Sequence, residues 1–322
     1  MKFNKIFDAF PAPEILDIPF AGLSLTDSAI RCIQFGKKDG GLYVQKYTEK
    51  KLNSGVIVSG QINDKEGLIR ALQTIKNDLK LEYVRVSLPE EKAYLFTAKI
   101  PIVKPNEVVS AIESKIEENV PVNPVELLYD YKLIDHRDRG HLDVVVSNVP
   151  ISIIDTYMDV ISSAGLNLLS LEIESQAVAR ALIDKDNHGT VLIVHFGPQK
   201  VGLYVANDKI VRFTSTMPIK GSPSDNLEFL SHEIKKLFVY WHTLKENVDR
   251  SEKKINEILI SGEISGEDVV RYLSKENTIP VVLGDVWTNT FDIDEVVPEI
   301  NFSDSLRYAV SVGLALPSDF LI

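Results

Sequence analysis

The chain has 322 residues, 44% of them hydrophobic and 25% charged, which is typical of a soluble globular protein with room for two domains. Acidic residues outnumber basic ones, 46 against 35, and the net charge is −11 at pH 7. Because nucleic-acid binders need a cationic surface to displace counterions from phosphates, this balance argues against a nucleic-acid partner.

The chain contains one cysteine, Cys32, so no disulfide can form within it, which is typical of a reducing cytoplasm. Because Cys32 lies in the apolar run 29–33, we expect a buried thiol rather than a reactive one. No apolar stretch reaches the roughly 18 residues that cross a bilayer, and no signal-peptide pattern is present. We therefore expect a cytoplasmic protein that meets the membrane only through a partner or a surface helix.

Two segments about half a chain apart share one design. Residues 23–46 read LSLTDSAIRCIQFGKKDGGLYVQK, and residues 194–212 read VHFGPQKVGLYVANDKIVR. Each has three β-type runs separated by two polar turns, which predicts a β-meander. A repeated meander predicts a duplicated fold with a ligand site in the cleft between its halves.

Apolar periodicity predicts a helix after each meander, at 64–81 and 225–244, and a last helix at 303–316. The segment between the meanders has a different character. It contains predicted strands at 84–88, 93–100, 127–134 and 142–148, predicted helices at 105–119 and 151–164, and a polar hairpin loop at 136–140. This β-β-α-β-β-α order is sufficient for a small α+β domain inserted at a surface loop.

Five segments carry a family resemblance, in chain order. They are GLSLTDSAIR at 22–31, EIESQAVARAL at 172–182, HFGP at 195–198, ILISGEIS at 258–265 and YAVSVGLAL at 308–316. Together they resemble the first phosphate loop, the linking segment, the second phosphate loop, the adenosine loop and the C-terminal helix of the FtsA/PilM branch of the actin-like ATPase superfamily. The resemblance covers about residues 20–317.

The resemblance implies an α/β fold: a duplicated actin-like fold of two RNase H-like halves with a small inserted α+β subdomain. The implied division is an N-terminal segment at 1–19, a first actin-like subdomain at 20–84 plus 166–188, the insertion at 85–165, and a second half at 189–322. The second half includes a helical part at 223–256.

In that family an aspartate of each phosphate loop helps to hold Mg²⁺, and a glycine lets backbone N–H groups reach the phosphates. Ser24 and His195 stand where the aspartates belong. Mg²⁺ prefers hard oxygen ligands, whereas imidazole suits zinc or copper better. Thr26 replaces a glycine of the first loop, and Pro198 follows Gly197 in the second and removes an N–H donor.

The adenosine loop and the rest of the cleft show similar departures. Gly262 is followed by Glu263, whose carboxylate would repel phosphates if it faced the cleft. Asp27 is either a displaced acid or a turn residue that bonds its own backbone. Lys236 stands where the family carries basic residues near the nucleotide, although a solvated helix face is the alternative. With Gly221, these residues complete a predicted degenerate nucleotide cleft.

For this cleft we predict no catalytic residues and no metal, and binding of ATP with magnesium is disfavoured. His195 has no ligand-type pattern of other histidines around it, so we expect a hydrogen-bonded histidine at a strand end rather than a metal ligand.

The resemblance implies a scaffold of the type IV pilus, or of a related type II secretion or DNA-uptake machine. Such a scaffold binds the N-terminal tail of a PilN-like membrane partner and can assemble into a ring. The tail would occupy a groove near residues 84–100 and the helix 105–119.

Two alternatives remain from the sequence. One is an active or nucleotide-binding ATPase of the same fold, which would need displaced acids such as Asp27. The other is an FtsA-like filament or membrane adaptor, in which residues 1–10 could dock on a membrane through Phe3, Ile6, Phe7 and Phe10. We favour packing on the protein or disorder for that segment.

Overall fold

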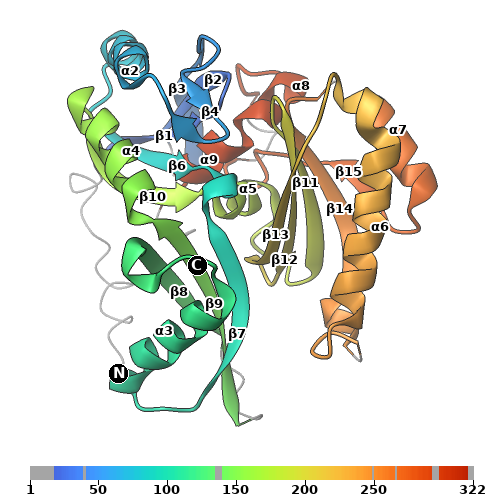
Figure 1. Cartoon of the computed structure of the whole chain (residues 1–322). Coiled ribbons are helices and arrows are strands. Elements are labelled where there is room, and N and C mark those ends of the chain that lie inside the picture. Colours follow the sequence, from blue (N-terminus) through green and yellow to red (C-terminus); the bar gives the residue numbers. More distant parts are fainter. Residues whose placement is uncertain are drawn as a thin grey trace.

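A computed structural model describes residues 18–317 except 39–40, 135–139, 249, 265–266 and 292–296. Within these residues two five-stranded sheets form the two halves of the molecule (Figure 1). The first has the strand order β10-β6-β1-β2-β3, and the second has the order β13-β12-β11-β14-β15. The strands of the first sheet are β1 (Phe20–Leu25), β2 (Ala29–Lys38), β3 (Gly41–Lys51), β6 (Tyr83–Leu88) and β10 (Asn167–Ile173). Those of the second are β11 (Thr190–Phe196), β12 (Lys200–Asn207), β13 (Ile210–Pro218), β14 (Ile255–Gly262) and β15 (Val281–Leu283).

The two sheets repeat one topology. In each, three consecutive strands form an antiparallel meander, and the first strand of the meander also pairs in parallel with a later strand, β6 or β14. In equivalent registers, Ser24 faces Arg31 and His195 faces Gly202 across the first hairpin of each half. The duplication predicted from the sequence is confirmed, and it brings the two predicted phosphate loops to the ends of β1 and β11.

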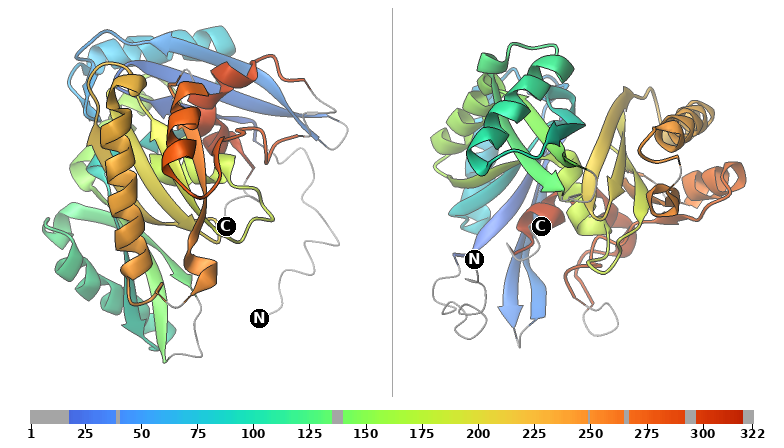
Figure 2. Two further views of the ribbon diagram at one scale, coloured as in Figure 1. Left: turned by 90° about the vertical axis from the view of Figure 1, so that its right-hand side faces the viewer. Right: turned by 90° about the horizontal axis from the view of Figure 1, so that it is seen from below.

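Helices cover the outer faces of both sheets (Figures 1 and 2). Helices α2 (Lys65–Leu79) and α4 (Ile151–Ser163) pack on the first sheet, and α6 (Leu227–Thr243) and α7 (Glu267–Glu276) pack on the second. The buried thiol of Cys32 belongs to the first core, where burial raises its pKa to about 12. This agrees with the expected unreactive thiol.

Two helices lie between the sheets: α5 (Glu174–Leu182) and α9 (Ala309–Ala315), the latter preceded by the short helix α8 (Phe302–Ser305). They approach so closely that a Cβ on Gly313 would lie 1.8 Å from the carbonyl oxygen of Ala177. A Cβ on Gly22 of β1 would likewise lie 2.1 Å from the carbonyl oxygen of Ser311. The small residues of the predicted C-terminal helix are therefore required where the halves meet.

The insertion is a separate layer formed by β7 (Tyr94–Pro101), α3 (Val108–Asn119), β8 (Leu127–Ile134) and β9 (His141–Pro150). Its antiparallel sheet has the order β7-β9-β8, and α3 covers one face through Ile112 and Ile116. β7 also lies along β13 of the second half, where the Thr97 hydroxyl donates to the Arg212 carbonyl over 3.4 Å.

The structure moves two elements out of the predicted insertion 85–165. β6 lies in the first sheet between β1 and β10, and α4 buries Tyr157, Val160 and Ile161 in the first core. The physical reason is that β6 is buried along almost its whole length, as a central parallel strand must be. The short hairpin of β4 (Ile57–Val58) and β5 (Gln61–Ile62) completes the first half.

Two predictions lie outside the described residues: the N-terminal segment 1–10, and the loop 136–140 except for Gly140. Among the helices that the structure describes, none is long and apolar enough to cross a membrane.

Candidate functional site: a filled cleft and an open groove

Most of the predicted nucleotide residues meet in a cleft between the two halves. The cleft is lined by Ser24, Thr26, His195, Gly197, Pro198, Gly262 and Glu263, together with charged residues that include Arg31, Glu174 and Lys200. The remaining free volume is only about 10 Å³. Since a single water needs roughly 10–15 Å³ of such volume, the cleft has room for about one water molecule.

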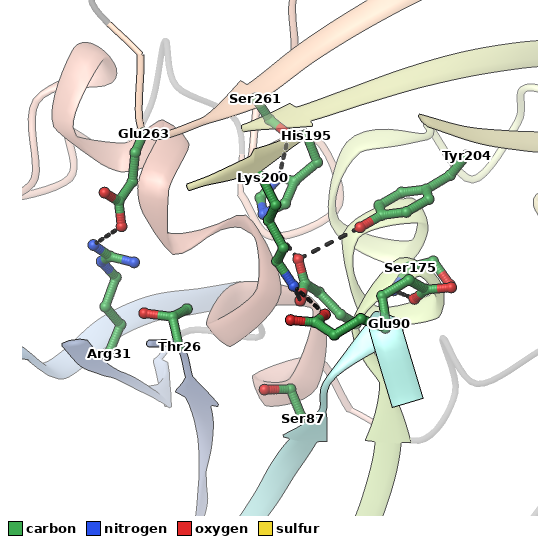
Figure 3. Close-up of polar contacts among 12 residues, drawn as sticks. Thr26, Arg31, Ser87, Glu90, Ser175, His195, Lys200, Tyr204, Ser261 and Glu263 are labelled. Carbon is green, nitrogen blue, oxygen red and sulfur yellow. Dashed lines mark hydrogen bonds and ion pairs between the residues drawn. The ribbon is translucent and has the colours of Figure 1, made fainter. Parts of the chain in front are cut away.

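Lys200 at the start of β12 spans this cleft. Its Nζ lies 2.7 Å from a carboxylate oxygen of Glu91 and 2.9 Å from one of Glu174, both in the part of the chain that precedes the second half (Figure 3). Burial alone would lower the pKa of Lys200, but the two carboxylates hold it above its usual value. Burial would also raise the pKa of Glu174, yet the charge of Lys200 holds it below its usual value. The Lys200 ammonium and the Glu174 carboxylate are therefore both charged.

A second ion pair joins the halves. Arg31 on β2 places Nη2 2.5 Å from Glu263 (Figure 3). Its Nε lies 2.7 Å from Glu49. The Arg31 side chain is only 5% exposed, and the two carboxylates keep its pKa raised despite its burial. The Glu263 carboxylate, expected to repel phosphates, is instead bonded to this guanidinium.

His195 is neutral and hydrogen-bonded. Its Nδ1 lies 2.9 Å from the Ser261 hydroxyl, and its Nε2 lies 3.6 Å from Glu174. Burial lowers the pKa of His195 to about 4, although Glu174 opposes the shift. This is the hydrogen-bonded strand-end histidine that the sequence predicts. Among the described residues, no group of three or more His, Cys, Asp and Glu side chains is arranged to hold a metal ion.

The loops at the cleft use their polar groups internally. The Thr26 hydroxyl donates to the Ala29 carbonyl and accepts from the Ala29 N–H, and the Gly197 N–H donates to the Lys200 carbonyl over 2.8 Å. Gly262 has a φ of +98°, and a Cβ there would lie 2.0 Å from the Phe196 carbonyl oxygen. This glycine is explained by the close approach of its own strand neighbour, without a ligand.

Three predicted cleft residues lie elsewhere. Asp27 accepts from the backbone N–H groups of Ser59 and Gly60, at 2.7 and 3.2 Å, so it fixes the β4–β5 turn rather than bonding its own backbone. Lys236 lies on the solvent face of α6 and pairs with Glu233 at 2.7 Å. Gly221, with a φ of +72°, precedes the turn that leads into α6.

Sequence reasoning missed the charged residues that close the cleft: Arg31, Glu91, Glu174 and Lys200. One signal was available for Arg31, because it faces Ser24 across the β1–β2 hairpin and so shares its side of the sheet.

A further buried acid lies at the same junction. Glu90 is 4% exposed, and its Oε2 accepts from the Ser175 N–H at the start of α5, 3.0 Å away (Figure 3). Burial raises the pKa of Glu90 to about 7, and the nearby charge of Glu174 adds to the increase. The junction between the halves therefore holds a buried acid whose pKa is raised towards neutral pH.

A large open groove of about 1180 Å³ lies between the first half and the insertion. One wall is the face of the β8–β9 sheet opposite α3, with Leu128 and Val145, and the other wall is β10 and α4. β8 and β10 are both edge strands. Leu128, Met158 and Leu169 are 58%, 48% and 43% exposed in this groove.

The position of the groove corrects one expectation. Arg85 and Leu88 line it, within the predicted segment 84–100. The helix 105–119 is absent from the lining among the described residues, because α3 packs on the opposite face of the insertion's sheet.

Comparison with known proteins identifies the family. Residues 22–224, more than half of the chain, match the family described as type IV pilus assembly protein PilM. The chain belongs to the PilM family. No curated protein sequence matches it significantly.

Solved structures support the same fold. A structure described as the PilM-PilN type IV pilus biogenesis complex matches with a TM-score of 0.77 at 14% identity, covering 92% of this chain and 98% of that chain. The ethanolamine utilization protein EutJ from Carboxydothermus hydrogenoformans matches with a TM-score of 0.50 at 14% identity, covering 95% and 91%. At such identities these matches establish the fold alone. The predicted actin-like fold is confirmed.

Proposed function

We propose that this PilM-family protein is a scaffold that holds the N-terminal tail of a PilN-like membrane protein in the groove between the first half and the insertion. It would act in the cytoplasm, at the inner-membrane assembly platform of a type IV pilus, and reach the membrane through this partner. The observation that carries the proposal is an open groove of about 1180 Å³ with three partly exposed apolar side chains. The similarity in fold to the PilM-PilN complex supports it.

The groove suits an extended peptide. The edge strands β8 and β10 offer backbone donors and acceptors that no strand within the described residues occupies on their outer sides. Apolar side chains of a bound tail would cover Leu128, Met158 and Leu169, and each Å² of apolar surface removed from water contributes about 25 cal/mol.

We also propose that the protein is a pseudo-ATPase. Phosphoryl transfer depends on a positioned Mg²⁺ ion and on neutralisation of the phosphate charges. In this cleft the positive charge of Lys200 is already paired with the carboxylates of Glu91 and Glu174. Asp27, the acid on which an active ATPase would depend, is bonded to the β4–β5 turn. No observation favours the alternative of a filament-forming membrane adaptor.

The test is binding of a synthetic peptide with the N-terminal cytoplasmic sequence of the PilN-like protein from the same genome, measured by titration calorimetry. We expect Leu169→Arg to weaken binding by about tenfold or more, because the charge would be desolvated against the apolar tail. Val239→Arg is the matched control, since Val239 is 65% exposed on α6 and outside the groove lining. Equal affinities for both variants and the wild type, or no binding by the wild type, would contradict the proposal.

A further inference from the structure

Cationic side chains gather at one end of the groove, in a chain whose net charge is −11. Lys132 on β8 and Lys209 in the β12–β13 turn both line it, although one belongs to the insertion and the other to the second half. Arg212 on β13 is near enough to Lys132 for their repulsion to help lower the pKa of Lys132. The basic end of the groove is the name used for Lys132 and Lys209 together with Arg212, which lies near Lys132 but is not itself among the residues that line the groove.

Two donors at the basic end lack partners. Lys132 Nζ and Arg212 Nε are buried, and neither forms a hydrogen bond within the described part of the chain. Burial is the main cause that lowers the pKa of Lys132, followed by repulsion from Arg212 and then from Lys209, with Asp208 opposing. Burial also lowers the pKa of Arg212 to about 10. A buried cationic donor without an acceptor is unfavourable, so these groups would gain from an anion.

Three acids lie near the basic end, and each already has another contact. Asp130, on the same face of β8 as Lys132, accepts from the Tyr131 N–H over 2.8 Å. Asp208 lies 2.6 Å from the Nδ1 of His188, and Asp143 lies 3.2 Å from the Nε2 of His141. Lys209 donates to the Lys185 carbonyl over 2.7 Å, which leaves two of its three protons for a ligand. The positive charge at this end of the groove is therefore only partly compensated.

The turn that carries Lys209 has an unusual backbone. Asp208 and Lys209 have φ values of 52° and 62°, where glycine or asparagine is favoured in such two-residue hairpins. Left-handed geometry at a non-glycine residue costs free energy and is concentrated at functional sites. The turn holds the Lys209 side chain beside the basic end at that cost.

We propose that the basic end is an anion subsite that receives a carboxylate side chain of the bound tail. This proposal rests on the peptide groove proposed above. Leu128, Asp130 and Lys132 alternate along one face of β8, so Lys132 lies about 13 Å from the exposed Leu128 at a rise of roughly 3.3 Å per residue. An extended tail beside β8 would then carry an acid about four residues from an apolar anchor.

The experiment is a paired scan of the PilN-like tail peptide. Each residue is replaced in turn by Glu and by Gln, and each pair is titrated against the full-length protein. We expect one position at which the Glu peptide binds about fivefold tighter than the Gln peptide, with a preference that weakens as salt is added. Lys132→Met should abolish this preference without lowering the melting temperature, because it removes an unpaired desolvated cation. Lys236→Met, which lies outside the groove, should leave it intact.

Lys209→Met provides a second variant at an exposed turn and should reduce the same preference. A tail that binds but shows no Glu preference at any position would overturn the anion subsite while leaving the groove proposal standing. A preference that persists in both Lys132→Met and Lys209→Met would also overturn it. If no tail peptide binds the wild type, both proposals fall.

Discussion

The filled cleft and the open groove are both lined by charged side chains from different parts of the chain. They differ in how the cations are paired with carboxylates. In the cleft, Lys200 and Arg31 each hold two carboxylates, and about 10 Å³ remains free. In the groove, Lys132 holds none among the described residues, and about 1180 Å³ remains open. The chain supplies its own counterions where its family resemblance predicts a nucleotide. Where we propose a partner, Arg180 is paired with Glu172, but the Lys132 ammonium has no hydrogen-bond partner within the described residues.

This contrast separates stability from binding. Changes in the cleft should alter the free energy of unfolding and leave tail binding unaffected. Changes in the groove should do the reverse. Measurements of unfolding free energy and of tail affinity on variants of each site test that separation.

The largest effect is expected for Lys200→Met. Removing the ammonium leaves Glu174, whose side chain is 8% exposed, uncompensated beside Glu91. Breaking a buried pair in this way typically costs about 3–5 kcal/mol of unfolding free energy. Urea denaturation at neutral pH measures the loss. Lys236→Met is the control, because its exposed pair with Glu233 contributes less than about 1 kcal/mol. Equal losses of unfolding free energy in the two variants would show that the cleft ion pairs do not stabilise the fold more than an exposed pair does.

The next effect is a pH dependence of the unfolding free energy, which two opposing contributions conceal in the wild type. The pKa of Glu90 is raised from 4.5 to about 7 in the folded protein, so its contribution to stability is present at low pH and lost as pH rises through that range. The pKa of His195 is lowered from 6.5 to about 4, so its contribution is present above that range and lost as pH falls through it. The contributions of Glu90 and His195 therefore change the unfolding free energy with pH in opposite directions, and the two pH ranges overlap.

Single substitutions should therefore expose one slope each. Glu90→Gln should give a protein that loses stability on acidification from pH 6.5 towards 4, because the response of Glu90 no longer offsets that of His195. His195→Asn should give one that loses stability as pH rises from 4.5 towards 7. Each change should be on the order of 3 kcal/mol, measured by urea denaturation across the pH series. Parallel pH profiles in the two variants would show that these groups do not titrate as proposed.

The strands, helices and repeated meander were predictable because their signals are local, whereas the actin-like fold was predicted from the family resemblance. The strand predicted at 127–134 coincides with β8 (Leu127–Ile134), and the two meanders follow from alternation and polar turns alone. The limits of the insertion were not predictable in this way. β6 is a buried apolar strand whose partner β10 comes about eighty residues later, and no local pattern encodes that pairing.

The candidate site was predictable only in part, for a related reason. Ser24, His195 and Pro198 depart from motifs that can be compared position by position. The pairing of Arg31 with Glu263 joins residues 232 positions apart, so it depends on how the halves close. The groove was expected near residues 84–100 and the helix 105–119, but within the described residues only the first of these segments lines it. Amphipathic spacing gives the helix an apolar face but does not say which face of the sheet it covers.

The smallest expected effect is that of nucleotide. We expect titration calorimetry with ATP and magnesium, repeated with ADP and without metal, to give no binding heat at millimolar nucleotide and no thermal shift. The cleft has room for about one water, and the loop N–H of Gly197 is already bonded to Lys200. The tail peptide, titrated into the same preparation, serves as the positive control.

A magnesium-dependent heat of binding would contradict the conclusion that the cleft is closed to ligands and that only the groove is open to them. Nucleotide would then have to separate Lys200 from Glu174 and Arg31 from Glu263, and release two carboxylates to the metal. Asp27→Asn would test whether a displaced acid restores the site, at the cost of the bonds to Ser59 and Gly60. If ATP also changed the affinity for the tail, the two sites would be coupled by linkage, and the closed cleft would be one state of a switch rather than a permanent seal.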